Sequence, residues 1–262
     1  MTEYIHGGSD AREVARLEKQ AGFIAPLEMK YLDAAPGMKV LDLATGVGAM
    51  AEELVRRFPG IELTGLDLRA SQLEVARQRH PVAQYVLADA TRMPFPDRTF
   101  DRVHCSWLLE HVPAPLDVLK EVHRVLKPSG YCHFIEVDNS KFETHPRLPA
   151  VTEAMDALNR AQQLAGGDPF IGPKLNGLFS EAGFAPVRII PCPIRGSAED
   201  PVFFQRFVDE FAEIFESLDE ALGPEQGPLI RAAVALLRGL LRTPGASLRY
   251  ESTIAQGFRP AA

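Results

Sequence analysis

The chain has 262 residues, of which 46% are hydrophobic and 24% are charged, and its formal charge is −7. A chain of this length is long enough to bury a substantial core, and this composition is ordinary for a globular protein. The acidic balance, together with the lack of any lysine- or arginine-rich run, argues against nucleic acid as a partner.

The first half of the chain alternates between strand-like and helix-like patterns. The apolar spacing predicts helices at 10–34, 49–58, 71–79 and 115–126. Short buried runs predict strands at 39–43, 61–66, 84–88, 100–106 and 131–137. Strands that alternate with helices of this length indicate right-handed crossovers and a parallel sheet with helices on both faces.

After Asp138 the alternation changes. We predict helices at 147–165 and 173–182, strands at 187–191 and 248–258, and a helical insertion at 199–242 between these two strands. The insertion holds nine acidic and four basic residues, which we expect on the outer face of a lid. It also carries phenylalanines at helical spacing, which predict core packing, the wall of an apolar pocket or a dimer face: Phe204, Phe207, Phe211 and Phe215.

Three chain turns bear residues suited to a nucleotide-like ligand. The strand at 39–43 runs into a turn with Gly46 and Gly48, where backbone can approach a ligand ahead of a helix. Asp67 ends the second strand, where a carboxylate can accept both hydroxyls of an adenosine ribose; capping of the next helix is the alternative. Asp89 follows the third strand and can face the adenine amino group.

Four segments in this order carry a family resemblance: VLDLATGVGAM, LTGLDLRASQL, VLADATRMPFPDRTFDRVHCSWLLEHV and LKEVHRVLKPSGYCHFIEVD. With them, residues 39–138 resemble the class I S-adenosylmethionine (SAM)-dependent methyltransferases, in the subgroup that includes the ubiquinone/menaquinone C-methyltransferases. The resemblance implies an α/β, Rossmann-like sheet of seven strands with the last strand antiparallel. One departure is Ala44, where many members carry a first glycine.

The resemblance also implies a place for each motif residue. Around the methionine part of SAM it places Asp42, Ala44, Thr45, Gly46 and Gly48. Asp67 would hold the ribose and Leu68 would flank the adenine, whose edge would meet Asp89 and Ala90. Ser106 would lie near the sulfonium, and Tyr4 would belong to an N-terminal segment that folds over the cofactor, with a frayed terminus as the alternative.

Methyl transfer from a sulfonium depends mainly on positioning, and some acceptors also need a base. His111 follows the fourth strand and is the first candidate, because neutral imidazole suits this task near pH 7; packing of the next helix is the alternative. Glu136 and Asp138 end the fifth strand on one face and are further candidates for a base or a substrate anchor. His133, in mid-strand, is expected to be an interior residue.

The cysteines and the apolar runs indicate in which cell compartment the protein is expected. Cys105, Cys132 and Cys192 form no C-x-x-C pair, so we expect reduced core thiols and no metal site. Residues 1–10 are polar, and the longest apolar stretch, 232–241, is shorter than the roughly 20 residues that span a bilayer. We therefore expect a cytoplasmic protein without membrane contact, either a monomer or a homodimer.

Together these patterns predict one methyltransferase domain over 1–262. It would comprise an N-terminal helical segment at 1–37, a SAM-binding core at 38–138, helical substrate or lid segments at 139–183 and 199–246, and the last two strands at 184–196 and 247–259. The expected reaction moves a methyl group from SAM, leaving S-adenosylhomocysteine, to oxygen, carbon or nitrogen of a small apolar or aromatic acceptor. The alternatives are a cyclase or isomerase that retains SAM and a nucleotide-binding sensor or oxidoreductase.

Overall fold

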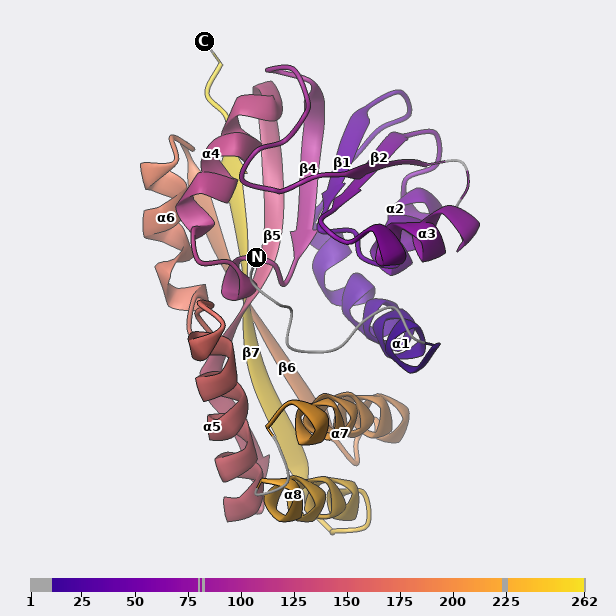
Figure 1. Ribbon diagram of the computed structural model, residues 1–262, viewed down its shortest axis with the longest axis vertical. Helices are drawn as coiled ribbons and strands as arrows, with labels where there is room; N and C mark the ends of the chain where they lie inside the picture. Colours follow the sequence, from indigo (N-terminus) through magenta and orange to yellow (C-terminus); the bar gives the residue numbers. More distant parts are fainter. Residues whose placement is uncertain (1–10, 80, 82, 223–225, 262) are drawn as a thin grey trace.

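The computed structural model describes residues 11–79, 81, 83–222 and 226–261, and they form a seven-stranded sheet with helices around it (Figure 1). The strand order is β3-β2-β1-β4-β5-β7-β6. The strands are β1 (Lys39–Leu43), β2 (Glu62–Asp67), β3 (Gln84–Leu87), β4 (Phe100–Ser106), β5 (Leu126–His145), β6 (Val187–Ser197) and β7 (Ser247–Phe258). β1 to β5 pair in parallel, and β7 is antiparallel to both of its neighbours. The expected Rossmann-like sheet with an antiparallel last strand is confirmed.

Helices cover both faces of the sheet, as the alternating pattern predicted. The helices are α1 (Ala11–Glu28), α2 (Ala49–Arg57), α3 (Ala70–Arg79), α4 (Pro115–Val125), α5 (Pro149–Leu164), α6 (Leu175–Glu181), α7 (Pro201–Leu222) and α8 (Gly227–Leu240), with short 3-10 turns η1 (Met29–Tyr31), η2 (Leu109–His111) and η3 (Gly172–Lys174). Apolar residues of α2 and the end of α1 bury one face. Those of α4 and α6 bury the opposite face.

Two strands are much longer than the sequence indicated. β5 continues from the predicted 131–137 to His145, and β6 continues from 187–191 to Ser197. Both extensions pair with β7, which bonds to β5 on one side and β6 on the other along most of its length. These three strands therefore project beyond the parallel core (Figure 1). The predicted helix at 173–182 is divided into η3 and α6.

The projecting strands support a second apolar cluster, formed with α5, α7, α8 and the middle of α1. Helices α5, α7 and α8 pack against one another over these strands, and α8 contacts both α5 and α7. The phenylalanine stripe of α7 is buried there: Phe204, Phe207, Phe211 and Phe215 are each at most 4% exposed. The prediction that this stripe packs a core is confirmed.

The acidic residues of α7 are only partly on an outer face, so that expectation needs correction. Three of them point toward α1 and pair with its cations: Arg12 with Glu216, Arg16 with Glu210, and Lys19 with Glu213. The Arg16 and Glu210 side chains are each only 5% exposed. Helix α1 thus joins the parallel core to α7 through ion pairs, which a count of the charged residues in 199–242 does not reveal.

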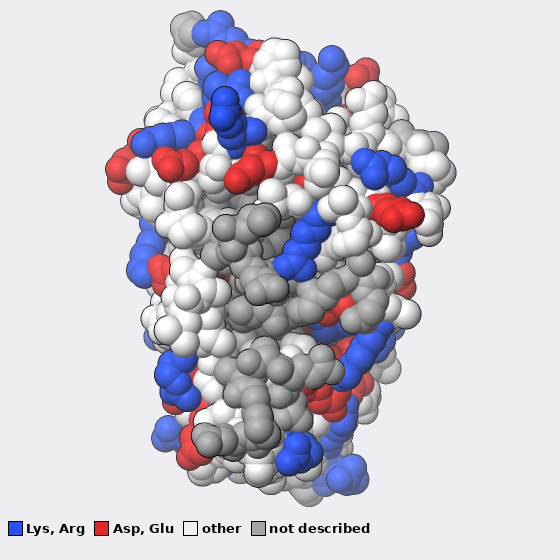
Figure 2. Space-filling view, in the orientation of Figure 1, with Lys and Arg blue, Asp and Glu red and all other residues white. Residues whose placement is uncertain are grey.

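The remaining surface and core features agree with the composition. Cys105, Cys132 and Cys192 are buried and free. Basic and acidic side chains alternate over the described part of the face in Figure 2, without an extended basic stripe there. Among the described residues, no helix combines the length and the apolarity that crossing a membrane requires.

Candidate active site

The turn after β1 is shaped by three left-handed residues, Ala44, Gly46 and Gly48, with φ of 57°, 55° and 80°. Ala44 tolerates this conformation at some cost, since residues with a side chain rarely adopt it. Gly48 begins α2, and a Cβ there would press on Ala76 and the Tyr85 hydroxyl. Gly48 borders neither of the cavities described next, so its expected contact with the methionine part of SAM is not supported.

Two adjoining cavities open at the carboxyl ends of the parallel strands, where such sheets bind ligands. The larger has a volume of about 290 Å³ and the smaller about 80 Å³. Both are bordered by Ala44, Gly46, Ser106 and Trp107, so they meet at the ends of β1 and β4. Trp107 also has a positive φ, 54°, and backbone strain of this kind is concentrated at functional sites.

The adenosine candidates line the larger cavity together. Asp67 accepts hydrogen bonds from the backbone N–H groups of Gly46 and Arg69, both at 2.9 Å. Burial raises its pKa, and these two bonds oppose the rise. Leu68 leaves 53% of its surface exposed at the cavity, as a flat apolar contact for a ring would require. Asp89 and Ala90 border the same cavity.

Asp42 and Thr45 line the smaller cavity. The Thr45 hydroxyl donates to the Asp42 carboxylate at 2.5 Å, and the other Asp42 oxygen lies 2.9 Å from His104 Nδ1. His104 Nε2 is in turn 3.3 Å from the Glu28 carboxylate, which also accepts from Ser106 at 3.1 Å. A buried chain of polar groups therefore runs below the cavity floor.

These buried polar groups hold a charged histidine, His104, between the carboxylates of Asp42 and Glu28. Burial alone would raise the pKa of Glu28, but the charge of His104 and their hydrogen bond lower it to about 2. Burial alone would lower the pKa of His104, but Glu28 and Asp42 raise it to about 10. His133, as expected for an interior residue, is fully buried and stacks on His104, with ring centroids 6.1 Å apart.

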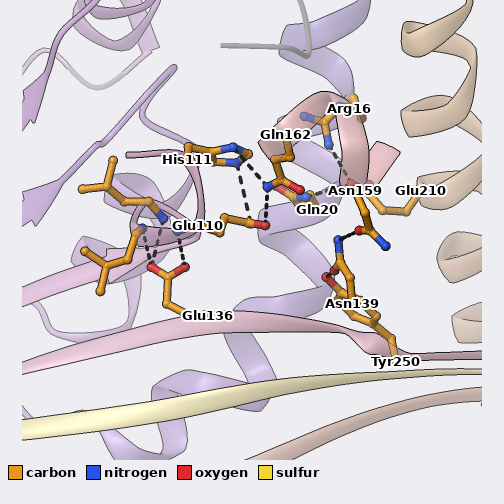
Figure 3. A network of polar contacts seen from close by, with 12 residues as sticks. Arg16, Gln20, Glu110, His111, Glu136, Asn139, Asn159, Gln162, Glu210 and Tyr250 are labelled. Atoms are coloured by element: carbon orange, nitrogen blue, oxygen red, sulfur yellow. Dashed lines mark hydrogen bonds and ion pairs between the residues drawn. The ribbon is translucent and has the colours of Figure 1, made fainter. Parts of the chain in front are cut away.

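His111 lines the larger cavity beside two residues that the sequence analysis did not select, Glu110 and Gln162. Gln162 Nε2 lies 2.6 Å from Glu110 Oε2 and 3.3 Å from His111 Nδ1 (Figure 3). Burial lowers the pKa of His111 to about 4, with the charges of Arg16 and Arg69 adding to the effect. His111 is therefore neutral near pH 7, as a base must be.

Glu136 is placed differently from its expected role as a base. Its side chain is fully buried, it borders neither cavity, and its carboxylate accepts the backbone N–H groups of Leu108, Leu109 and Glu110 at 3.0, 2.8 and 3.2 Å (Figure 3). The geometry contradicts a catalytic function, because these bonds occupy the carboxylate away from any ligand. Glu136 instead fixes the turn η2 that presents Glu110 and His111.

The far end of the larger cavity is apolar and is built by the projecting strands and the added helices. It is bordered by Phe23, Val137, Leu158, Ile194, Phe207, Phe211, Ile214 and Tyr250. Polar atoms are few there. The Tyr250 hydroxyl donates to Asn139 at 2.7 Å, and Asn139 donates to Asn159 at 2.8 Å (Figure 3). Asp138, the other anchor candidate, turns to Ser140 and does not line the cavity.

Sequence reasoning missed the partners that come from other elements. Glu110 is the residue before His111, and a carboxylate within the otherwise apolar run Leu108, Leu109 and Val112 is the one sequence feature that could have marked it. Glu28, Gln162 and Asn139 lie on helices or strands distant in sequence, so no local spacing marks them. Tyr4 falls outside the described residues.

Residues 41–134 match a family model described as a methyltransferase domain. Demethylmenaquinone methyltransferase from Chlorobaculum tepidum is 32% identical over 158 residues, covering 60% of this chain and 58% of that protein. Residues 41–134 are therefore similar to methyltransferase domains. The chain spans about half the length of the curated relatives that it matches, from 44% to 58%.

Solved structures share the fold of this chain at low sequence identity. Haemonchus contortus phosphoethanolamine N-methyltransferase 2, in complex with phosphomonomethylethanolamine and S-adenosylhomocysteine, matches 92% of this chain and 52% of its own, with TM-score 0.59 and 19% identity. The [4+2]-cyclase SpnF matches 94% of this chain and 81% of its own, with TM-score 0.56 and 21% identity. At such identities the likeness concerns the fold.

Proposed function

We propose that this chain binds SAM and transfers its methyl group to a small apolar or aromatic acceptor. The observation that carries this proposal is a cavity bordered at one end by Asp67, Leu68 and Asp89 and at the other by the phenylalanines of α7. One end suits an adenosine, and the other suits a ring without charge. The names of the curated relatives, which include demethylmenaquinone methyltransferases, support a reduced quinone ring as the acceptor class.

The cavity residues have distinct tasks in this reaction. Asp67 would accept the ribose hydroxyls, Leu68 would cover the adenine, and Asp89 and Ala90 would meet its edge. Ala44, Gly46 and Thr45 would border the methionine part, above the buried charges of Asp42, His104 and Glu28. The sulfonium supplies the activated methyl group, and the protein contributes alignment and exclusion of water. Cytoplasmic location and a monomeric or homodimeric state stay predictions.

Replacing Asp67 tests cofactor binding. Asp67→Asn keeps one neutral acceptor but removes charge-assisted bonds, each contributing about 1.5–3 kcal/mol, so SAM should bind roughly 10- to 100-fold more weakly in calorimetry. Asp97→Asn is the matched control, because this carboxylate is 69% exposed and lies outside both cavities. Equal affinities of wild type and Asp67→Asn would refute the ribose contact.

The products distinguish the proposal from its alternatives. Incubation of the wild type with SAM and 1,4-naphthohydroquinone should form S-adenosylhomocysteine and a methylated ring. A rearranged product without S-adenosylhomocysteine would favour a cyclase or isomerase. Binding of NAD without binding of SAM would favour a nucleotide-binding protein of another class.

A further inference from the structure

Glu110 differs from the other buried carboxylates at the cavity because no cation pairs with it within the described part of the chain. Its Oε2 accepts one bond from Gln162, whereas the contact between its Oε1 and His111 Nε2 is 3.6 Å, too long for a hydrogen bond. Among the described residues, Oε1 therefore has no hydrogen-bond donor. By contrast, Glu210 accepts from both Arg16 and Gln20.

The backbone of Glu110 is held from both sides. Its N–H donates to the Glu136 carboxylate at 3.2 Å, and its carbonyl oxygen accepts from Asp168 N–H at 2.8 Å. A Cβ on Gly167 would overlap this carbonyl oxygen, so only glycine allows the close approach. The side chain is thus presented to the cavity from a rigid turn, as catalytic groups require.

The hydrogen-bond directions assign separate roles to the neighbours. The Gln162 amide nitrogen can only donate, so it donates both to Glu110 and to His111 Nδ1. His111 Nδ1 then acts as an acceptor, and its remaining proton lies on Nε2. The lone pair on Nδ1, with which a neutral imidazole would accept a proton, already accepts the hydrogen bond from Gln162. Glu110 is left as the group with an available acceptor oxygen.

We propose that Glu110 is the general base of the methyl transfer proposed above, and that the acceptor presents an O–H or N–H group, or an acidified C–H, to its Oε1. The proton moves from the acceptor to the carboxylate as the acceptor's electron pair attacks the methyl carbon. The carbon–sulfur bond breaks, its electron pair stays on sulfur, and S-adenosylhomocysteine forms. The proton later leaves to solvent, which restores the carboxylate.

The surroundings of Glu110 set the pH range of this step. Burial raises its pKa to about 7, which the bond from Gln162 opposes. The ionisable groups around it are His111 on the same turn, Glu136 on β5 and Tyr250 on β7, while Arg16 on α1 and Arg69 before α3 act on His111. A base with a pKa near the working pH combines availability with proton affinity. Activity should therefore rise as pH increases through about 7.

The test compares wild type, Glu110→Gln and Glu210→Gln with SAM and 1,4-naphthohydroquinone, following S-adenosylhomocysteine from pH 5.5 to 9. Glu210 is the matched control, since it borders the same cavity, is 5% exposed and also has its pKa raised to about 7 by burial. Glu110→Gln should lower kcat by about 100-fold or more and abolish the rise of kcat/KM through pH 7. Its Kd for SAM should stay within about twofold of wild type, which excludes a general loss of folding. Glu210→Gln should keep the rise.

The outcomes separate this inference from the function on which it rests. If the wild type forms S-adenosylhomocysteine and Glu110→Gln keeps kcat within about threefold, or retains the rise through pH 7, Glu110 is not the base but methyl transfer stands. If the wild type binds SAM and forms no S-adenosylhomocysteine, methyl transfer to this acceptor class fails and the assignment of Glu110 fails with it.

Discussion

Replacing Arg16 by methionine should destabilise the protein strongly, because its charge balances two buried carboxylates. Arg16 contacts Glu13 at 2.8 and 2.9 Å and Glu210 at 2.7 Å, and all three side chains are at most 7% exposed. Removing one partner of a buried ionic group typically costs about 3–5 kcal/mol, since the remaining charge is left without compensation. For a chain of this size that corresponds to roughly a 10 °C lower Tm.

The matched control is Lys19→Met, on the same face of α1. Lys19 pairs with Glu213 at 2.8 Å, but its side chain is 60% exposed, so the expected cost is only about 0–1 kcal/mol. Urea-induced unfolding, followed by circular dichroism at pH 8, measures both free energies. Similar costs for Arg16→Met and Lys19→Met would refute the argument that burial determines the contribution of these pairs.

The pH dependence provides an independent check. Burial raises the pKa of Glu210 to about 7 even beside Arg16, and loss of the guanidinium removes the opposing attraction. A carboxyl whose pKa is raised in the folded state destabilises the fold above its ordinary pKa and recovers stability as pH falls and it takes up a proton. The deficit of Arg16→Met should therefore be smaller at pH 5.5 than at pH 8. A deficit that does not shrink would contradict this linkage.

Two further changes test the groups below and beside the cavity. Gly167→Ala should lower the free energy of unfolding by about 1–3 kcal/mol and impair turnover, because the new Cβ would overlap the Glu110 carbonyl oxygen. The control is Gly177→Ala, at an exposed position of α6 with no neighbouring atom near the new Cβ, which should raise the free energy of unfolding by roughly 0.5–1 kcal/mol. Equal Tm values for the two variants would contradict the predicted overlap. The Glu28–His104 pair, with pKa values of about 2 and about 10, stabilises the fold fully between about pH 4.5 and 6.5, and its contribution declines at lower pH and as pH rises toward 10. Glu28→Gln should weaken the fall in Tm between pH 7 and 10, and an unchanged slope would argue against the charged pair.

Local patterns were sufficient for the parallel core and for the end of the larger cavity that Asp67, Leu68 and Asp89 border. The strand ends at Leu43, Asp67 and Ser106 follow from short apolar runs bounded by turns, and parallel strands bring such ends to one edge. The lengths of β5 and β6 were not predictable in the same way. Their extensions exist because β7 satisfies their backbone groups, and pairing with a strand 50 or more residues away leaves no local trace.

The sequence by itself determined the class of fold, the family resemblance and the residues expected around adenosine, because each depends on short segments with a fixed periodicity and spacing. Only the tertiary structure showed what surrounds Glu136, Glu110 and Arg16. Whether a carboxylate holds a turn, faces a cavity or balances a charge depends on what surrounds it, and those neighbours come from distant parts of the chain. In the same way, the acidic residues of α7 could be recognised as partners of cations only from the position of α1 beside α7.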